Sequence, residues 1–112
     1  MPYLPPTERD FTRAVIELAR ASGWLVSHFG NTVKVVRKRD GRTLAVPDKD
    51  AAGFPDLVCA RRGRLVVAEL KMPGKKPTLG QVAWLQELDL VPGAQAYAWW
   101  PKDWDTIVEV LR

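Results

Sequence analysis

The segment from Asp56 to Leu70 constrains the fold of this chain more than any other part. Two strand-like runs, Asp56–Ala60 and Arg64–Leu70, flank a tight Arg61-Arg62-Gly63 turn. Short apolar runs joined by so few residues predict an antiparallel β-hairpin. The second run contains Val-Val-Ala and ends in leucine, which is typical of an interior strand. We therefore expect this hairpin to lie within the central sheet.

The other elements are predicted from helix caps, apolar periodicity and glycine or proline stops. A first helix is expected over Thr7–Ser22, because Thr7 and Asp10 form a capping-box pattern. A second helix is expected to begin at Thr78 and to end at Pro92-Gly93. Its expected apolar face consists of Leu79, Val82, Trp84, Leu85 and Leu88. The remaining predicted elements are three strands and a closing helix: Trp24–Phe29, Thr32–Arg37, Ala94–Trp100 and Trp104–Leu111.

This order of elements, α-β-β-β-β-α-β-α, predicts an α/β or α+β fold with a mixed central sheet flanked by helices. At 112 residues, the chain has the usual size of one domain, so residues 1–112 are assigned to one unit. Residues 1–6 are expected to be an irregular lead-in, and Val46–Gly53 a loop. With 46% apolar and 27% charged residues, the composition argues against disorder.

Single cysteine and histidine residues exclude several kinds of site. Cys59 alone cannot form an internal disulfide, and His28 alone excludes metal sites built from several histidines. No apolar stretch approaches the roughly 20 residues that span a bilayer. The N-terminus also lacks the basic and apolar regions of a signal peptide, so a soluble, cytoplasmic protein is expected.

Positive charge is concentrated in the middle of the chain. The formal net charge is +4, yet Lys34–Lys76 contains 12 basic and 5 acidic residues, a local net charge of +7. Such a distribution predicts a positive face directed at a polyanion. The alternative is an ordinary solvated surface, and charge alone does not choose between the two.

The predicted hairpin brings two carboxylates and one ammonium group together. Glu69 and Lys71 are two residues apart on a strand and must point to the same face. A chain that rises from Asp56 and returns to Glu69 is symmetric about Arg62-Gly63, which places Asp56 beside Glu69. The three side chains should therefore meet at the open end of the hairpin.

Such a cluster suits metal-dependent hydrolysis of a phosphodiester. Adjacent carboxylates repel each other unless they are protonated or bind a metal, and oxygen ligands favour Mg²⁺ or Mn²⁺. The ion can activate water and stabilise charge on a phosphate, while Lys71 orients the water or neutralises that charge. The alternative is a surface ion pair between Glu69 and Lys71, which is common and contributes little stability. The apolar character of the strand argues against that alternative.

These residues resemble the signature of PD-(D/E)XK nucleases, in which Pro55-Asp56 precedes Glu69-Leu70-Lys71. The surrounding sequence resembles the VRR-Nuc family, especially its short stand-alone phage and bacterial members. The resemblance extends from about Glu8 to Leu111 and rests on four segments: Gly53-Phe54-Pro55-Asp56-Leu57-Val58, Ala68-Glu69-Leu70-Lys71, Thr78-x-x-Gln81-x-x-Trp84-Leu85 and Tyr97-x-Trp99-x-Pro101-x-Asp103-Trp104.

The resemblance implies a restriction-endonuclease-like core that binds Mg²⁺ or Mn²⁺. Asp56, Glu69 and the backbone carbonyl of Leu70 would be the metal ligands, and Lys71 the catalytic lysine. Compact members of this family are similar to Holliday junction resolvases, which act as homodimers on four-way DNA junctions. The expected function is therefore that of a structure-selective endodeoxyribonuclease, a hydrolase acting on ester bonds in branched DNA.

Three further residues have a structural and a functional interpretation. Glu8 is either an additional acid near the metal, as the resemblance implies, or a favourable charge at a helix N-terminus. Gln81 matches a family position at the site, but Thr78-x-x-Gln81 is also a capping box. His28 matches a polar position close to the site, and a single histidine is also commonly structural.

Basic and aromatic residues provide the predicted DNA contacts. Lys75, Lys76 and the run Arg37-Lys38-Arg39 are expected to contact phosphates, which contributes affinity rather than sequence information. Trp99, Trp100 and Trp104 are candidates for stacking on bases, but with Trp24 and Trp84 they also fit a core or a dimer interface.

Two other functions fit the sequence. One is a flap or nicking nuclease that acts as a monomer. The other is a non-catalytic module that keeps the nuclease fold and binds branched DNA for partners. The complete set of two acids and a lysine favours an enzyme, because a protein that only binds DNA gains nothing from carboxylates facing a phosphate.

Overall fold

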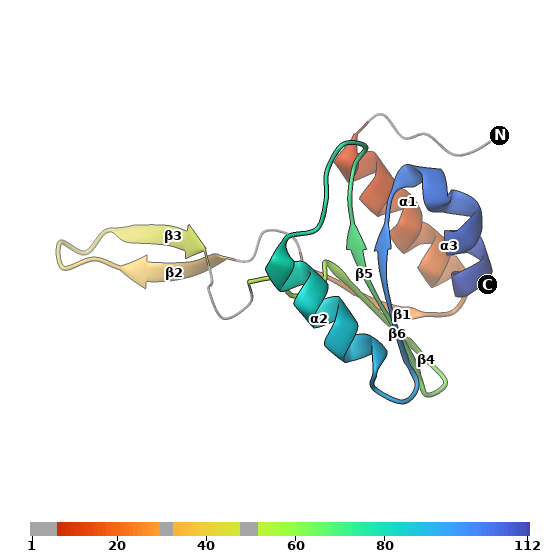
Figure 1. Cartoon of the computed structure of the whole chain (residues 1–112). Coiled ribbons are helices and arrows are strands. Elements are labelled where there is room, and N and C mark those ends of the chain that lie inside the picture. The colour runs from red at the N-terminus through yellow and green to blue at the C-terminus, as the bar shows by residue number, and fades with distance from the viewer. Residues whose placement is uncertain (1–6, 30–32, 48–51) are drawn as a thin grey trace.

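A four-stranded mixed sheet with helices on its two faces forms the centre of the protein (Figure 1). The structure is a computed structural model, and it describes residues 7–29, 33–47 and 52–112. The predicted lead-in 1–6, the predicted strand residue Thr32 and part of the predicted loop, 48–51, lie outside the described residues. The prediction of a single mixed α+β domain is confirmed.

The sheet has the strand order β1-β4-β5-β6. Its strands are β1 (Leu25–His28), β4 (Leu57–Arg61), β5 (Arg64–Leu70) and β6 (Ala94–Trp99). The β1–β4 and β4–β5 pairs are antiparallel, and β6 lies parallel to β5. A parallel pair needs a crossover connection, and helix α2 (Leu79–Asp89) provides it.

Helix α1 (Glu8–Ala21) forms where the capping pattern predicts it. The Thr7 hydroxyl accepts a hydrogen bond from the backbone N–H of Asp10 at 3.1 Å. Phe11, Val15 and Ala19 recur every four residues and are fully buried, so α1 presents one apolar face to the sheet. Gly23, at φ 88°, then turns the chain into β1.

Helix α3 (Trp104–Leu111) packs beside α1 and closes the same side of the sheet (Figure 1). A short 3₁₀ turn, η2 (Pro101–Asp103), precedes it. Ile107 and Leu111 are fully buried within the core that α1 shares with the sheet. The indole N–H of Trp24 donates to the carbonyl of Leu111 at 2.9 Å, which ties the start of β1 to the end of α3.

The β4–β5 hairpin has the predicted register. Arg62 and Gly63 form the turn with φ angles of 50° and 78°, as expected for a two-residue turn of the type that matches strand twist. Leu57 lies opposite Ala68. Val66, Ala68 and Leu70 alternate into the core on the α1 side, so the residues between them face the α2 side.

The predictions for residues 32–47 lack one strand. Strand β2 (Val33–Arg37) lies where a strand is predicted. It pairs with β3 (Thr43–Pro47), where no strand is predicted and whose last two residues fall in the predicted loop Val46–Gly53. The two strands form a separate hairpin that projects from the body of the protein (Figure 1). β3 is a short segment that ends in proline, which is why its sequence reads as part of a loop.

The expected apolar face of α2 is also wrong in part. Thr78 caps the helix and Gln81 completes the capping box, as predicted. However, Leu79 is 90% exposed and Trp84 is also exposed. The helix carries apolar residues around its whole circumference, so its sequence does not identify which face packs on β5 and β6. No helix among the described residues combines the length and apolarity needed to cross a membrane.

Candidate functional site

The open end of the β4–β5 hairpin brings Asp56, Glu69 and Lys71 together, as the sequence predicts. Asp56 immediately precedes β4, and the hairpin register continued by one residue places it opposite Glu69. One Asp56 carboxylate oxygen, Oδ2, accepts a hydrogen bond from the backbone N–H of Leu70 at 3.2 Å. The backbone of β5 therefore orients one acid beside the other.

Glu69 is the only buried charged residue in the described part of the chain, with 2% of its surface exposed. Its Oε1 accepts a hydrogen bond from Gln81 Nε2 at 2.9 Å and lies 3.5 Å from Lys71 Nζ. Its Oε2 is buried and has no hydrogen-bond partner. An unsatisfied carboxylate oxygen in the interior is costly, and either a proton shared with the Asp56 carboxylate or a bound cation would relieve that cost.

Burial is the main cause of an unusual protonation equilibrium at Glu69. Burial first, and then the neighbouring Asp56 carboxylate, raise the pKa of this carboxyl from 4.5 to about 7. Lys71 acts in the opposite direction but does not cancel these effects. Glu69 therefore titrates near neutral pH, where a carboxyl can exchange its proton for a cation.

Gln81 makes both contacts that its sequence position suggests, one in the cap of α2 and one with the acid pair. Its side-chain oxygen accepts a hydrogen bond from the N–H of Thr78 at 2.8 Å and completes the cap of α2. Its side-chain nitrogen donates to Glu69. The amide thus uses one end for the helix and the other for the site, which fixes the Glu69 carboxylate relative to α2.

A close backbone contact explains the glycine that begins the Gly53-Phe54-Pro55-Asp56 segment. Gly53 has a φ of 83°, and a Cβ there would lie 2.9 Å from the carbonyl carbon of Gly80. The neighbouring Phe54 ring packs edge-on against Phe29, at 5.8 Å, and Trp84, at 5.1 Å. These contacts fix the segment before Asp56 against α2.

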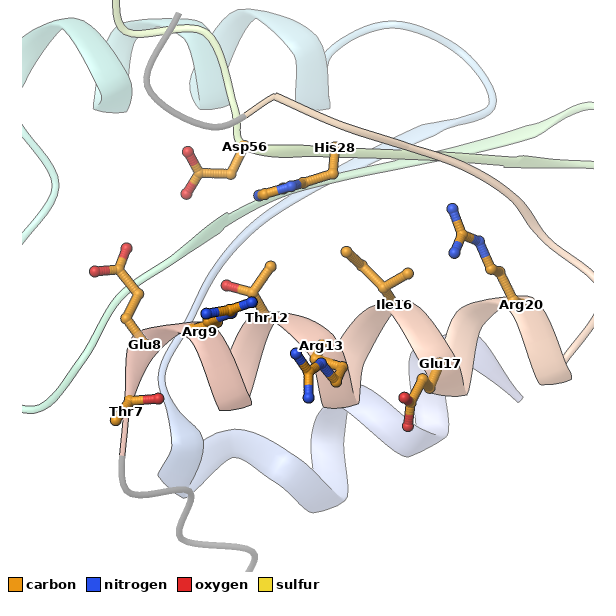
Figure 2. Close-up of a pocket in the computed structure, with 10 residues that line it drawn as sticks. All are labelled: Thr7, Glu8, Arg9, Thr12, Arg13, Ile16, Glu17, Arg20, His28 and Asp56. Carbon is orange, nitrogen blue, oxygen red and sulfur yellow. The ribbon is translucent and has the colours of Figure 1, made fainter.

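A pocket of about 770 Å³ opens between α1 and the edge of the sheet at Asp56 (Figure 2). Asp56 and His28 project into it from the sheet side, and Glu8 projects toward the same end from α1. His28 is exposed and pairs with Leu57 in the sheet, directly beside the acid pair. Glu8 and His28 therefore border the same pocket as Asp56, but no group of three histidine, cysteine or acidic side chains that could hold a metal forms among the described residues.

A second hollow of about 360 Å³ contains the predicted lysines. Lys71, Lys75 and Lys76 line it together with Glu8. Glu8 lines both hollows, Asp56 borders the first and Lys71 borders the second. Lys75 and Lys76 are exposed, so they are available to phosphate groups next to the site.

Five other basic residues from the middle of the sequence lie away from the acids. Arg37, Lys38 and Arg39 lie on the projecting β2–β3 hairpin. Arg61 and Arg64 lie at the turn end of the central hairpin, where their guanidinium groups are 4.3 and 5.1 Å from the ring of Trp24. The basic middle of the sequence therefore does not form one positive face at the site.

Three arginines escaped the sequence interpretation although they line the large pocket. Arg9, Arg13 and Arg20 all belong to α1 and border the pocket. Their spacing of four and seven residues predicts a common helix face. The apolar periodicity of this helix identifies only its buried face, whereas the spacing of the arginines is a separate signal for a second, basic face.

The tryptophans divide between core and surface. Trp24 and Trp99 are buried, which favours the structural interpretation for both. Trp84 is 40% exposed, and Trp100 and Trp104 are partly buried. The indole N–H of Trp100 donates to the carbonyl of Lys75 at 2.9 Å, so this residue supports the lysine segment.

The acid pair fits a divalent cation. Among the described residues, no three histidine, cysteine or acidic side chains form a ready-made cluster. Asp56 and Glu69 nevertheless provide the oxygen donors that Mg²⁺ and Mn²⁺ prefer. The unpartnered Glu69 Oε2 and the raised pKa of Glu69 both indicate a carboxylate that a cation would stabilise. Mg²⁺ commonly binds through one or two carboxylates and water, so two acids suffice.

Comparison with known proteins leaves the family open. No family model matches the chain, and no curated protein is significantly similar to it. The functional conclusion must therefore rest on the site itself.

Proposed function

We propose that this protein is a divalent-metal-dependent endonuclease that hydrolyses phosphodiester bonds in branched DNA. The observation that supports it best is the buried Glu69 carboxylate, whose Oε2 has no partner, next to Asp56 and Lys71. Glu69 contacts Lys71 and Gln81 through Oε1, which leaves Oε2 available to a metal.

In this proposal each residue has a separate task. Asp56 and Glu69, with the backbone carbonyl of Leu70, would bind Mg²⁺ or Mn²⁺. The bound ion supplies an activated water and stabilises negative charge on the phosphate. Lys71 presents an ammonium group, with 18% of its side chain exposed, to the phosphate or to the attacking water. Gln81 keeps the Glu69 carboxylate in position.

We further propose that the protein acts as a homodimer on four-way junctions. Large apolar side chains on and just beyond α2 support self-association: Leu79, Trp84, Leu90 and Val91 are all exposed. Large apolar side chains that are exposed in one copy are often buried in an oligomer. Two copies would present two acid pairs, as resolution of a junction requires. The mass in solution at micromolar concentration tests the dimer separately from the chemistry.

Cleavage of a labelled four-way junction tests the activity. With Mg²⁺ or Mn²⁺ present, Asp56→Asn should lower the cleavage rate at least about 100-fold, because it removes a metal-binding charge with little change in shape. Asp40→Asn is a matched control, because Asp40 lies on the projecting hairpin and should leave the rate unchanged. Equal cleavage by the wild type and Asp56→Asn would contradict the proposal.

Lys71→Ala separates catalysis from binding. We expect cleavage to be lost while affinity for the junction changes little, since Lys71 is one of many cations near the DNA. Parallel loss of binding and cleavage would instead make Lys71 a DNA contact. Flap, bubble and plain duplex substrates, assayed beside the junction, would define the preferred DNA structure and test the monomeric alternative.

A further inference from the structure

The pocket beside the acid pair continues along α1 as a groove. Its described lining includes Arg9, Arg13 and Arg20 on the helix and His28 on the sheet side (Figure 2). Arg20 reaches from the last turn toward the sheet, whereas Arg9 and Arg13 lie along the side of the helix that faces the viewer. Thr12 and Ile16 point from α1 into the space between the helix and the sheet.

These three arginines have no partner among the described residues. Neither an ion pair nor a side-chain hydrogen bond joins Arg9, Arg13 or Arg20 to any described residue. By contrast, Arg61 donates to the carbonyls of Ser22 and Arg112, and its role is structural. Unpaired guanidinium groups gathered along one groove are suited to bind an external anion.

The charges change along the groove from acidic to mainly basic. Glu8 and Asp56 project into the end where the acid pair lies (Figure 2), and Glu17 also borders the groove, between Arg13 and Arg20 along α1. Toward the other end, Arg20 is the charged side chain that points into the space. The groove therefore runs from the acid pair to a mainly basic stretch that is suited to anions.

The length and lining of the groove indicate which part of a nucleic acid it fits. Arg9 and Arg20 are separated by about 16 Å along the helix, at about 1.5 Å per residue. One strand of a DNA duplex carries a phosphate every 3.4 Å or so of helix axis and at wider spacing along its own winding path, so this length covers a few successive phosphates. No Phe, Tyr or Trp is among the described residues that line the groove, so bases have no aromatic platform there.

We propose that this groove binds the phosphate backbone of the DNA strand that enters the acid pair, along one side of the scissile bond. The inference rests on the proposed function, because the acid pair defines where the strand is cut. Arg9, Arg13 and Arg20 contact successive phosphates of a base-paired arm. Lys75 and Lys76, in the second hollow, are placed to contact phosphates on the other side of the acids.

Salt-dependent binding without metal tests the groove independently of catalysis. A fluorescent four-way junction is titrated in EDTA over a range of salt concentrations with Arg13→Gln, Arg20→Gln and the double variant. Each lost phosphate contact should lower the slope of log K against log [salt] by about 0.9 and weaken binding roughly 8-fold at 0.1 M salt. Glutamine preserves helix propensity, and circular dichroism confirms the fold of each variant.

Arg112→Gln is the matched control, because Arg112 pairs with Glu109 at the end of α3 and does not line the groove. It removes the same charge and should leave the slope unchanged. If the double variant has the slope of the wild type, the groove does not bind phosphates and the inference is overturned.

Cleavage by the same variants distinguishes the two proposals. If both are correct, the double variant should cut with an increased KM and nearly unchanged kcat, and phosphate-ethylation interference on one side of the cut should disappear. A wild type that never cuts, but whose binding depends on the arginines, would contradict the nuclease and leave the groove standing. Normal cutting by the double variant together with an unchanged salt slope would contradict the groove and leave the nuclease standing.

Discussion

The two β-hairpins of this protein have similar local chemistry but very different surroundings. Each is antiparallel, and each turn contains a glycine with positive φ, 78° at Gly63 and 87° at Gly41. The β4–β5 hairpin lies at the centre of the main sheet, whereas Val35 in the β2–β3 hairpin is 70% exposed. Turn residues thus specify a hairpin, and contacts from distant elements decide whether it is buried.

The same comparison extends to a carboxylate and a cation two residues apart in each hairpin. On the projecting hairpin, hydrogen bonds from Arg42 lower the pKa of the exposed Asp40 carboxyl. On the central hairpin, burial raises the pKa of Glu69 even though Lys71 is close by. Burial therefore determines the direction of the shift, and it makes only one of these pairs suitable for chemistry.

The largest contrast should be in stability. Leu57 on β4 is fully buried, and Leu57→Ala should lower the free energy of unfolding by about 2–5 kcal/mol, because it leaves a cavity. Val36 on β2 is 40% exposed, and Val36→Ala should change that free energy by less than about 0.5 kcal/mol. Urea unfolding at constant m-value measures both. Similar losses for the two variants would mean that the projecting hairpin is packed in solution.

Glu69 should make stability depend on pH in the absence of metal. Its pKa is about 7 in the folded protein and near 4.5 when unfolded, so the folded state retains a proton that the unfolded state releases between these values. The stability contributed by neutral Glu69 is fully present below about pH 4.5 and is lost as pH rises through 7. The loss is about 1.4 kcal/mol per pH unit, on the order of 3 kcal/mol in total.

Glu69→Gln provides the comparison, because its amide stays neutral and keeps an oxygen for Gln81 Nε2. In EDTA, urea unfolding from pH 5 to 8 should show a decline for the wild type that the variant lacks. Added Mg²⁺ should restore stability at pH 8 to the wild type alone, since it binds the ionised pair. Parallel pH curves for the two proteins would contradict the assigned protonation of Glu69.

Local sequence signals predicted most of the fold but not the partners of every strand. The cap at Thr7 and the turn at Arg62-Gly63 depend on a few neighbouring residues, and both are confirmed. Strand β3 was not predicted because it is short and ends in proline, and whether the β2–β3 hairpin joins the main sheet depends on tertiary contacts that a short segment does not encode. The exposed face of α2 was missed because apolar residues surround this helix, so that its periodicity carries no direction.

The candidate site was predictable to the extent that it depends on hairpin symmetry. Asp56, Glu69 and Lys71 follow from counting residues away from the turn, and the structure brings them together. The link between Gln81 and Glu69 depends on how α2 docks on the sheet, which no local pattern specifies. The protonation of Glu69 likewise depends on burial by several elements.

A matched pair of glycine substitutions gives the smallest and most specific comparison of the hairpins. Gly63 and Gly41 both have positive φ, and a Cβ at either position would have no atom within 4 Å. Backbone strain is therefore the main cost of an alanine, roughly 1–2 kcal/mol in the left-handed region.

Gly63→Ala should lower the free energy of unfolding by this amount, because the central hairpin folds with the whole domain. Gly41→Ala should change it by less than about 0.5 kcal/mol, because the projecting hairpin can open locally without unfolding the core. Hydrogen exchange should then show faster exchange of the β2–β3 amides in Gly41→Ala alone, and equal global destabilisation by both variants would show that the two hairpins unfold as one unit.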